Sequence, residues 1–265
     1  MHIVVCTKQA PDTAAKMSVD AEGKISWGDS PLVINPWDEY AVEEALLLRD
    51  AHGGQVTVIA MGPEEAREAL KHAVAMGCDA AIRVWDESFT GSDTLATSYI
   101  LGQAIKKLGD VDLVLLGRGT VDSDTNQVGP ALAQRLGFSP LMYVSKIDQI
   151  DPGAKTIAVE RLLEQGRQIV SSSLPALVGT VKEINEPRYP SFIGIRKAAK
   201  MEMPVWSAAD IGAEEAKVGV SGSGVTWPTV FAPPVRESEC EIIEAEDARA
   251  AARILADKLI AEKVV

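Results

Sequence analysis

The chain is predicted to fold as an α/β protein with a doubly wound, mostly parallel sheet. Apolar runs of strand length alternate with amphipathic stretches of helix length over the first half of the 265 residues. Glycine and proline stand at most of the junctions between them. Because parallel strands need crossover connections, and helices then cover both faces of the sheet, this alternation favours a parallel sheet.

The elements follow in order from the amino terminus. Residues 2–7 form an apolar run typical of a buried strand, and a small hairpin is predicted around residues 20–23. Asn35-Pro36 predicts a helix start, with Asn as the N-cap and Pro in the first turn, and Gly53-Gly54 ends that helix. The same unit repeats with strands at 55–61, 80–85 and 112–116 and with helices at 64–76, at 92–108 and from near Thr125.

From residue 141 the pattern changes. Short β-branched runs at 142–144, 156–159, 168–170 and 176–178 predict antiparallel strands that extend the sheet. A basic stretch through Lys200 is helix-like, a Gly/Ser/Pro-rich arm covers residues 219–234, and an amphipathic helix is expected at 245–261. We therefore predict an α/β domain at 1–200 and a C-terminal arm and helix at 201–265.

Composition narrows the class of protein. The formal net charge of −12 argues against nucleic acid and acidic membranes as partners, because such partners select clustered Lys and Arg. No apolar run reaches 18 residues, and the start of the chain lacks the pattern of a secretory signal, so a cytoplasmic location is expected. Three widely spaced cysteines and three isolated histidines indicate neither a disulfide framework nor a metal site.

Glycine-rich and polar residues follow several predicted strands. In a doubly wound sheet, ligands bind beyond the carboxyl ends of the strands, where the strand order reverses. Gly117 and Gly119 let the backbone approach a ligand, the amides of residues 125–128 hold phosphate, and Asp122 or Asp124 accepts a hydrogen bond from a ribose hydroxyl. The predicted adenine-nucleotide site comprises Cys6, Lys8, Asn35, Asp38, Ala60, Met61, Gly62, Gly117, Arg118, Asp122, Asp124, Thr125, Asn126, Gln127, Val128 and Gly129.

Two features keep this prediction open. The chain has neither the Gly-x-Gly-x-x-Gly fingerprint nor the P-loop motif, so the site is of unusual form. Asn35 has a second interpretation, as a helix cap and nothing more. No arrangement of side chains indicates nucleophilic or acid–base chemistry, so no catalytic residue is predicted.

Motifs along nearly the whole chain resemble the β subunit of electron transfer flavoproteins. They are Lys8-Gln-Ala-Pro-Asp12, Asn35-Pro-Trp-Asp-Glu-Tyr-Ala-Val-Glu-Glu-Ala45, Ala75-Met-Gly-Cys-Asp79, Asp112-Leu-Val-Leu-Leu-Gly117, Val159-Glu-Arg-Leu-Leu-Glu164, Leu174-Pro-Ala-Leu-Val178 and Asn185-Glu-Pro-Arg-Tyr189. The resemblance implies a fold of the adenine nucleotide α-hydrolase type. It also implies a larger α subunit that carries an electron-transferring FAD, and a β-subunit crevice that holds either structural AMP or a second FAD.

Two elements resemble the electron-bifurcating members of that family. They are Gly91-Ser-Asp-Thr-Leu-Ala-Thr-Ser98 and Asp122-Ser-Asp-Thr-Asn-Gln-Val-Gly-Pro130. The resemblance implies FAD in this chain, with Asp93, Thr94 and Thr97 near the isoalloxazine and Arg118 near the pyrophosphate or an anionic flavin. From the residues alone, Ser92 to Thr94 is equally an N-cap cluster. Gly119-Thr120 departs from the Gln-Ala that family members more often show, which leaves the flavin contacts open.

The resemblance implies a complete electron path. NADH would give a hydride to this FAD, one electron would pass to a low-potential acceptor such as ferredoxin or flavodoxin, and the other to the α-subunit FAD and an FAD-dependent dehydrogenase. The dehydrogenase would dock on a loop near residues 190–200 of the nucleotide- or flavin-binding domain, through Phe192, Ile193, Arg196 and Lys197, although Phe192 and Ile193 equally suit a small satellite core. The arm and helix at 201–265 would pack on the α subunit, unless the helix packs on its own domain. Two alternatives remain: an AMP-binding β subunit that docks acyl-CoA-type dehydrogenases, and an ATP-binding regulatory or hydrolytic α/β protein.

Overall fold

The computed structural model describes residues 1–234 and 240–264, and residues 235–239 and 265 of the predicted C-terminal region lie outside the described residues. The chain forms two compact units, Met1–Val230 and Phe231–Val265. Residues 201–230 thus pack with the first unit, whereas the sequence analysis groups them with the C-terminal arm by their expected role. In the second unit, helix α7 (Ala248–Ala261) begins at Asp247, whose side chain accepts a hydrogen bond from the Ala250 N–H.

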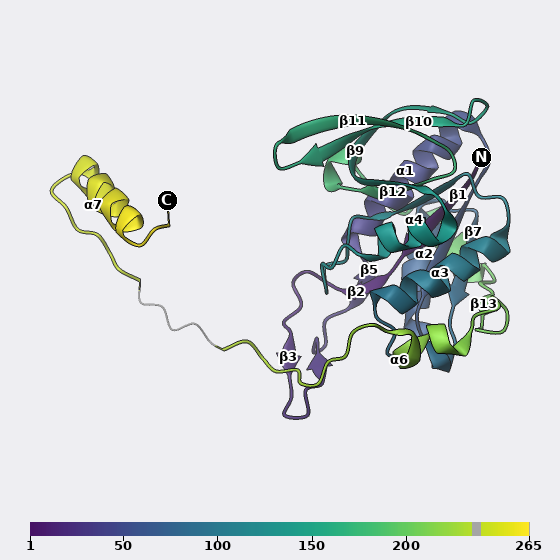
Figure 1. Ribbon diagram of the computed structural model, residues 1–265, viewed down its shortest axis with the longest axis horizontal. Helices are drawn as coiled ribbons and strands as arrows, with labels where there is room; N and C mark the ends of the chain where they lie inside the picture. The colour runs from purple at the N-terminus through teal and green to yellow at the C-terminus, as the bar shows by residue number, and fades with distance from the viewer. Residues whose placement is uncertain (235–239, 265) are drawn as a thin grey trace. The chain divides into compact units, whose positions relative to one another are not determined.

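The first unit is built on a nine-stranded sheet with the order β11-β10-β9-β12-β8-β1-β6-β7-β13 (Figure 1). All neighbours from β9 to β13 in that order are parallel, and only the β9-β10 and β10-β11 pairs are antiparallel. The predicted α/β class with a mostly parallel sheet is therefore confirmed. The strands are β1 (His2–Thr7), β2 (Gln9–Pro11), β3 (Ser18–Val19), β4 (Ile25–Ser26), β5 (Leu32–Ile34), β6 (Gln55–Met61), β7 (Ala80–Val84), β8 (Leu113–Gly117), β9 (Ser139–Asp151), β10 (Thr156–Leu163), β11 (Gly166–Ser173), β12 (Ala176–Thr180) and β13 (Val205–Trp206).

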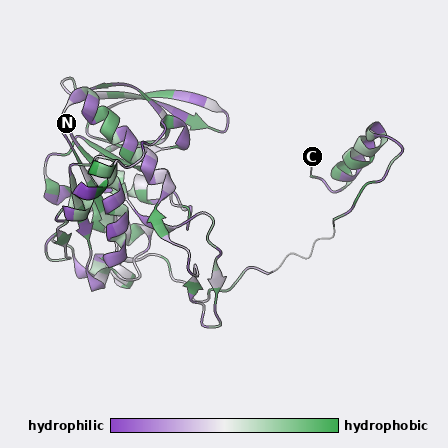
Figure 2. Cartoon of the chain, turned by 180° about the vertical axis from the view of Figure 1, so that it is seen from behind, coloured by the Kyte–Doolittle hydropathy of each residue, from purple (hydrophilic) through white to green (hydrophobic). Residues whose placement is uncertain are grey.

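Helices cover both faces of the sheet. Alternate residues of β1 enter different cores: Ile3 and Val5 pack with α1 and α2, whereas Val4 and Cys6 pack with α3 and α4. Figure 2 shows the resulting pattern, with apolar strands inside and mixed helices outside. The helices are α1 (Pro36–His52), α2 (Arg67–Met76), α3 (Thr94–Leu108), α4 (Val128–Leu136), α5 (Phe192–Lys200) and α6 (Gly219–Gly222), with 3-10 turns η1 (Glu64–Ala66), η2 (Glu87–Phe89), η3 (Lys182–Ile184) and η4 (Glu215–Lys217).

Two sequence-based expectations about elements are wrong. The run 176–178 belongs to β12, which is parallel and lies between β8 and β9 instead of extending the sheet as an antiparallel strand. All five residues of β12 are buried, as suits a strand covered on both faces. Helix α4 begins at Val128 instead of near Thr125. Asp124 and Asn126 have φ of 44° and 57°, in the left-handed region, so the chain cannot be helical there.

Among the described residues, no helix combines the length and the apolar character needed to cross a membrane.

Candidate functional site

The strand order reverses at β1. Strands β6 and β7 follow on one side of β1, and the chain then crosses back so that β8 lies on the other side. The carboxyl ends of β1 and β8 therefore flank a topological switch point, the place where open α/β sheets bind ligands. The loop that follows β8, residues 117–127, starts at this edge and is called the nucleotide loop below.

Asp38 joins the two strand ends. It lies in the first turn of α1 and is only 4% exposed. Its carboxylate accepts hydrogen bonds from the Lys8 N–H at 2.9 Å, from the Gly117 N–H at 3.0 Å and from the Thr7 hydroxyl at 3.4 Å. Burial raises the pKa of Asp38 to about 7, because the hydrogen bonds from these donors offset only part of the effect of burial. Asp38 thus ties the ends of β1 and β8 to the first turn of α1.

Asn35 occupies the N-cap position of α1 but makes no side-chain cap hydrogen bond. Its side-chain amide instead donates to the Gly119 carbonyl at 2.9 Å, and its oxygen accepts from the Val121 N–H at 3.2 Å. Asn35 is fully buried. The interpretation of Asn35 as a helix cap and nothing more is therefore wrong: its side chain tethers the nucleotide loop, and its contact with a ligand stays a prediction.

Lys8 and Asp122 close the loop over the end of β1. The Lys8 ammonium contacts Asp122 Oδ2 at 2.5 Å. The other carboxylate oxygen, Asp122 Oδ1, and the side-chain oxygen of Asn126 are both buried without a hydrogen-bond partner. Since a buried acceptor without a donor is costly, these two atoms mark a place where donors from a bound molecule are expected.

The nucleotide loop has an irregular backbone that brings its polar groups inward. Asp124 and Asn126 are both left-handed, whereas Gln127 is the N-cap of α4. A side chain at position 119 would displace the Asn126 amide, because a Cβ there would lie 2.0 Å from Asn126 Oδ1. The departure at Gly119 is therefore compatible with this loop conformation. Thr125 and Gln127 are exposed, Val128 is half-buried and Gly129 is buried.

Residues 60–62, at the end of β6, and Cys6, at the end of β1, mainly pack against their neighbours and present few polar groups. Ala60 pairs with Thr7 across the β1-β6 register, so residues 60–62 lie beside the end of β1. Ala60 is fully buried, Met61 is half-buried, and the Gly62 N–H donates to the Val84 carbonyl at 3.2 Å. Cys6 is buried on the α3 side, and burial raises the pKa of its thiol well above its usual range.

Asp93 is the N-cap of α3, and its carboxylate has no free acceptor position facing the nucleotide loop. Oδ1 accepts from the Leu95 and Ala96 N–H groups, and Oδ2 accepts from the Gly224 and Val225 N–H groups of the arm. Thr94 reaches the loop, since its hydroxyl donates to Gln127 Oε1 at 2.7 Å. Thr97 is half-buried one turn further along α3.

The four expected docking residues lie on α5, which is distant in sequence from the nucleotide loop. Phe192 is 90% exposed and Ile193 is 83% exposed, so neither belongs to a satellite core. Helix α5 packs on α2, where a Cβ at Gly194 would lie 2.1 Å from the Ala75 carbonyl. Arg196 is exposed, and the Lys197 ammonium donates to the Cys78 carbonyl at 3.2 Å.

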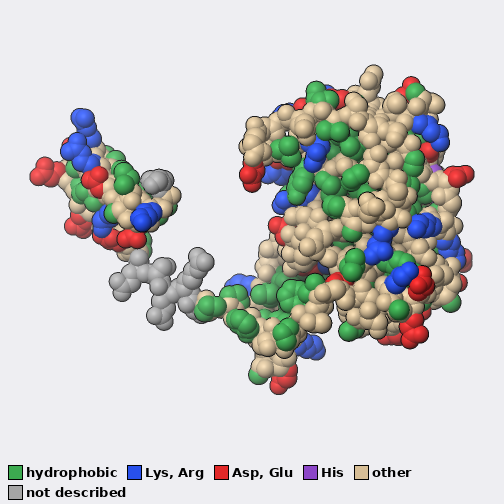
Figure 3. Space-filling view, viewed as in Figure 1, with side chains coloured by type: hydrophobic (Ala, Val, Ile, Leu, Met, Phe, Trp, Pro, Cys, Tyr) green, Lys and Arg blue, Asp and Glu red, His purple; other side chains and the backbone are tan. Residues whose placement is uncertain are grey.

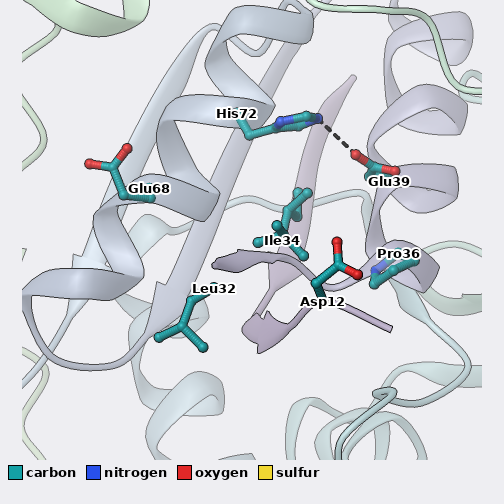
Figure 4. A pocket seen from close by; sticks show the side chains of 8 residues that line it. Asp12, Leu32, Ile34, Pro36, Glu39, Glu68 and His72 are labelled. Atoms are coloured by element: carbon teal, nitrogen blue, oxygen red, sulfur yellow. Dashed lines mark ion pairs between the residues drawn. The ribbon is translucent and has the colours of Figure 1, made fainter. Parts of the chain in front are cut away.

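A separate hollow of about 430 Å³ lies between β5 and the helices α1 and α2. Figure 4 shows His72 pointing to Glu39, with Ile34 and Pro36 below them. His72 Nε2 and Glu39 Oε1 are 2.8 Å apart. The hollow shares no lining residue with the nucleotide loop. Among the described residues, no group of three or more His, Cys, Asp or Glu side chains is arranged to hold a metal ion.

Sequence reasoning missed two features of the site. Trp37 contacts Arg118 in the nucleotide loop, although only its neighbours Asn35 and Asp38 carried a predicted role. The arm residues 223–225 bind Asp93 across more than a hundred positions of sequence. Nothing in the sequence near residue 224 signals this contact, whereas Trp37 adjoins two site residues and offered a weak signal.

The fold and the site agree with a known class of protein. A family model described as the electron transfer flavoprotein domain matches residues 28–211. The chain belongs to the electron transfer flavoprotein family.

The relatives of the chain match it over most of its length. Protein FixA of Azorhizobium caulinodans is 42% identical over 267 residues, which cover 99% of this chain and 93% of that protein. The electron transfer flavoprotein subunit beta of Clostridium acetobutylicum is 43% identical over 223 residues, covering 84% and 85% of the two chains. The subunit of the same name from Megasphaera elsdenii is 36% identical over 273 residues, covering 100% of each.

Proposed function

We propose that this chain is the β subunit of a heterodimeric, electron-bifurcating electron transfer flavoprotein and holds FAD in the crevice between β1 and β8. When bound, FAD would supply the redox chemistry, namely acceptance of two electrons from NADH and their transfer one at a time, to a low-potential acceptor such as ferredoxin or flavodoxin and to the α-subunit FAD and an FAD-dependent dehydrogenase. The protein supplies binding, orientation and electrostatics.

The observation that carries the proposal is the pair of buried acceptors without partners, Asp122 Oδ1 and Asn126 Oδ1. Ribose hydroxyls and the adenine amino group are hydrogen-bond donors, whereas phosphate oxygens at neutral pH are acceptors. These two atoms therefore fit the nucleoside part of an adenine nucleotide. The first-turn amides of α4 lack intrahelical partners and suit the phosphates. These residues fit the adenosine diphosphate half of FAD.

The choice of FAD over AMP has separate support. Asp93, Thr94 and Thr97 stand at the start of α3, and the Thr94 hydroxyl contacts Gln127 in the nucleotide loop. A ligand that extends beyond the adenylate toward α3 would meet these threonines. The Asp93 carboxylate is occupied by four backbone N–H groups, so in this proposal it positions the start of α3 and does not itself contact a flavin.

The proposed α subunit would meet an exposed apolar surface. Met17 and Ile25 of the β3-β4 hairpin and Val225 and Trp227 of the arm are exposed large apolar side chains. Figure 3 shows apolar side chains gathered where the arm passes the hairpin. An apolar surface of this kind on an acidic protein favours a partner chain. The names of two of the relatives, subunit beta, agree with such a pairing.

The ligand content of the purified complex tests the proposal. The chain is produced with its co-expressed partner subunit, the complex is denatured, and the released FAD, AMP and ATP are separated and counted. Two FAD per heterodimer are expected. One FAD with one AMP would overturn the bifurcating assignment in favour of the AMP-binding alternative. ATP bound to a chain without flavin or partner would indicate a regulatory or hydrolytic protein instead.

A pair of matched variants ties the ligand to the nucleotide loop. Asn126→Ala removes one of the unpartnered acceptors, and the β-subunit ligand should be lost while the α-subunit FAD stays. Asn185 Oδ1 is also buried without a partner, but Asn185 donates to Tyr40 and Glu44 on α1, outside the loop. Asn185→Ala should therefore leave the ligand stoichiometry unchanged.

A further inference from the structure

Trp37, at the start of α1, and Arg118, directly after β8, form a stacked pair. The guanidinium carbon of Arg118 lies 4.6 Å from the centroid of the Trp37 ring, in the geometry of a cation–π contact. The backbone N–H of Arg118 donates to the Thr180 carbonyl at 2.9 Å. Both ends of Arg118 are therefore held, its backbone by the sheet and its guanidinium by an indole ring.

A glycine makes this stacking possible. Trp37 is the second residue of α1 and precedes Asp38, which binds the Gly117 N–H. A Cβ at Gly117 would lie 2.5 Å from the Trp37 Cβ and 2.6 Å from the Trp37 carbonyl carbon. Because one of these atoms is backbone, α1 could not approach β8 this closely with any other residue at 117. The close approach brings residue 37 beside residue 118.

The second contact of Arg118 is much weaker. Arg118 Nη2 lies 3.7 Å from Asp124 Oδ1, and the Asp124 side chain is 61% exposed. An exposed ion pair at this distance contributes little, and a phosphate group can replace the carboxylate at the guanidinium. The indole face, in contrast, remains available to the guanidinium while its N–H groups bind an anion in the ring plane.

We propose, building on the proposed nucleotide site, that Trp37 is a positioning residue that holds the Arg118 guanidinium for the phosphates of the bound adenine nucleotide. Asp124 is the contact that the phosphates replace. An arginine that is already immobilised loses less side-chain entropy on binding, so the stacking raises the affinity for phosphate-bearing ligands. It has no such effect on adenosine, which lacks phosphate.

The test compares ADP with adenosine. The purified complex is depleted of its exchangeable ligand by dialysis, and each compound is titrated by calorimetry. Trp37→Leu should weaken ADP binding about tenfold, within the range of a cation–π contact, and leave adenosine binding unchanged. Trp37→Phe keeps an aromatic face and should restore most of the ADP affinity. Arg118→Gln should weaken ADP binding at least as much as Trp37→Leu.

A double variant and a matched control separate positioning from general stability. In the Arg118→Gln background, Trp37→Leu should cause no further loss of ADP affinity. Trp206, on the edge strand β13, makes a comparable cation–π contact: the Lys107 ammonium lies 4.8 Å from the centroid of its ring. Trp206→Leu should leave ADP affinity unchanged.

Other results of these titrations would contradict either the positioning role of Trp37 or the nucleotide site as a whole. Equal losses for ADP and adenosine in Trp37→Leu, or additive losses in the double variant, would show that Trp37 only supports the fold, and would overturn the positioning role alone. Failure of the unaltered complex to bind either compound would overturn the nucleotide site and the positioning role together.

Discussion

The starts of α1 and α3 look alike in sequence and serve different purposes. Both are preceded by a residue that commonly caps helices, Asn35 or Asp93. At α3 the prediction of a cap is confirmed, since Asp93 Oδ1 accepts from the Leu95 and Ala96 N–H groups. At α1 the Asn35 side chain leaves the helix end alone and binds the nucleotide loop.

The difference teaches that the surroundings of a helix end decide how its capping residue is used. Asn35 lies at the switch point, where the backbone of residues 119–121 has buried polar groups to satisfy. Asp93 faces the arm, where exposed N–H groups of residues 224 and 225 donate to its second oxygen. A capping signature therefore predicts the helix start, and the opposing backbone determines the second partner.

The largest expected effect is that of Asn35→Ala. The substitution leaves the half-buried Gly119 carbonyl and Val121 N–H without partners, which should cost about 2 kcal/mol of unfolding free energy. It should also weaken nucleotide binding, because the loop loses its tether. Urea unfolding measures the first effect and ADP titration the second. A loss smaller than that of Asp93→Ala would contradict the tethering role of Asn35.

The pH dependence of stability should have opposite signs at the two helix starts. Burial raises the pKa of Asp38 from 3.8 to about 7, so between these values the folded state keeps a proton that the unfolded chain loses. Stability then falls as pH rises through this window, by about 1.4 kcal/mol per pH unit. At Asp93, burial opposes ionisation, but backbone N–H donors outweigh it and lower the pKa. That contribution is present above the ordinary pKa and is lost as pH falls through the lowered value.

Substitution by asparagine isolates each contribution. An amide, like a protonated carboxyl, accepts at one atom and donates at the other, so Asp38→Asn should remove the decline between pH 4 and pH 7. Asp93→Asn should instead remove a loss that occurs only below about pH 4. Unfolding curves at pH 3, 5 and 7 distinguish these results. An unchanged slope between pH 5 and pH 7 in Asp38→Asn would show that Asp38 is ionised throughout that range.

The smallest expected effect is that of Asp93→Ala, about 1 kcal/mol for loss of an N-cap. Its diagnostic result is local: the amides of Gly224 and Val225 should exchange hydrogen faster, because their acceptor is gone. Asp86→Ala is the matched control, since Asp86 caps η2 and accepts from the Ala208 N–H instead of from the amides of residues 224 and 225. Equal acceleration at 224 and 225 in both variants would contradict a specific role for Asp93.

Much of the sheet could be predicted because its signals are local. The strand at 2–7 and the strand at 55–61 match β1 and β6 residue for residue, since buried parallel strands are continuous apolar runs with sharp ends. The place of β12 could not be predicted. Its sequence is that of any short β-branched strand, and only the pairing with β8 and β9 makes it parallel and central.

In the candidate site, too, some features could be predicted from the sequence and others depend on how the chain packs. The sequence indicated the crevice, because strand ends followed by glycines and acids are readable from spacing. It did not indicate that Asp38 would bridge Lys8 and Gly117, because that contact depends on two loops meeting. The stacking of Trp37 on Arg118 depends on the same approach of α1 to β8.

By itself, the sequence determined the succession of strands and helices along the chain and the start of α1, since these follow from local periodicity and capping chemistry. Only the tertiary structure decided which polar side-chain atoms find a hydrogen-bond partner. Asp93 has both oxygens occupied by backbone donors, whereas Asp122 and Asn126 each keep one buried oxygen without a partner. The physical reason is that a hydrogen bond between distant segments depends on how the chain packs, and no local pattern specifies it.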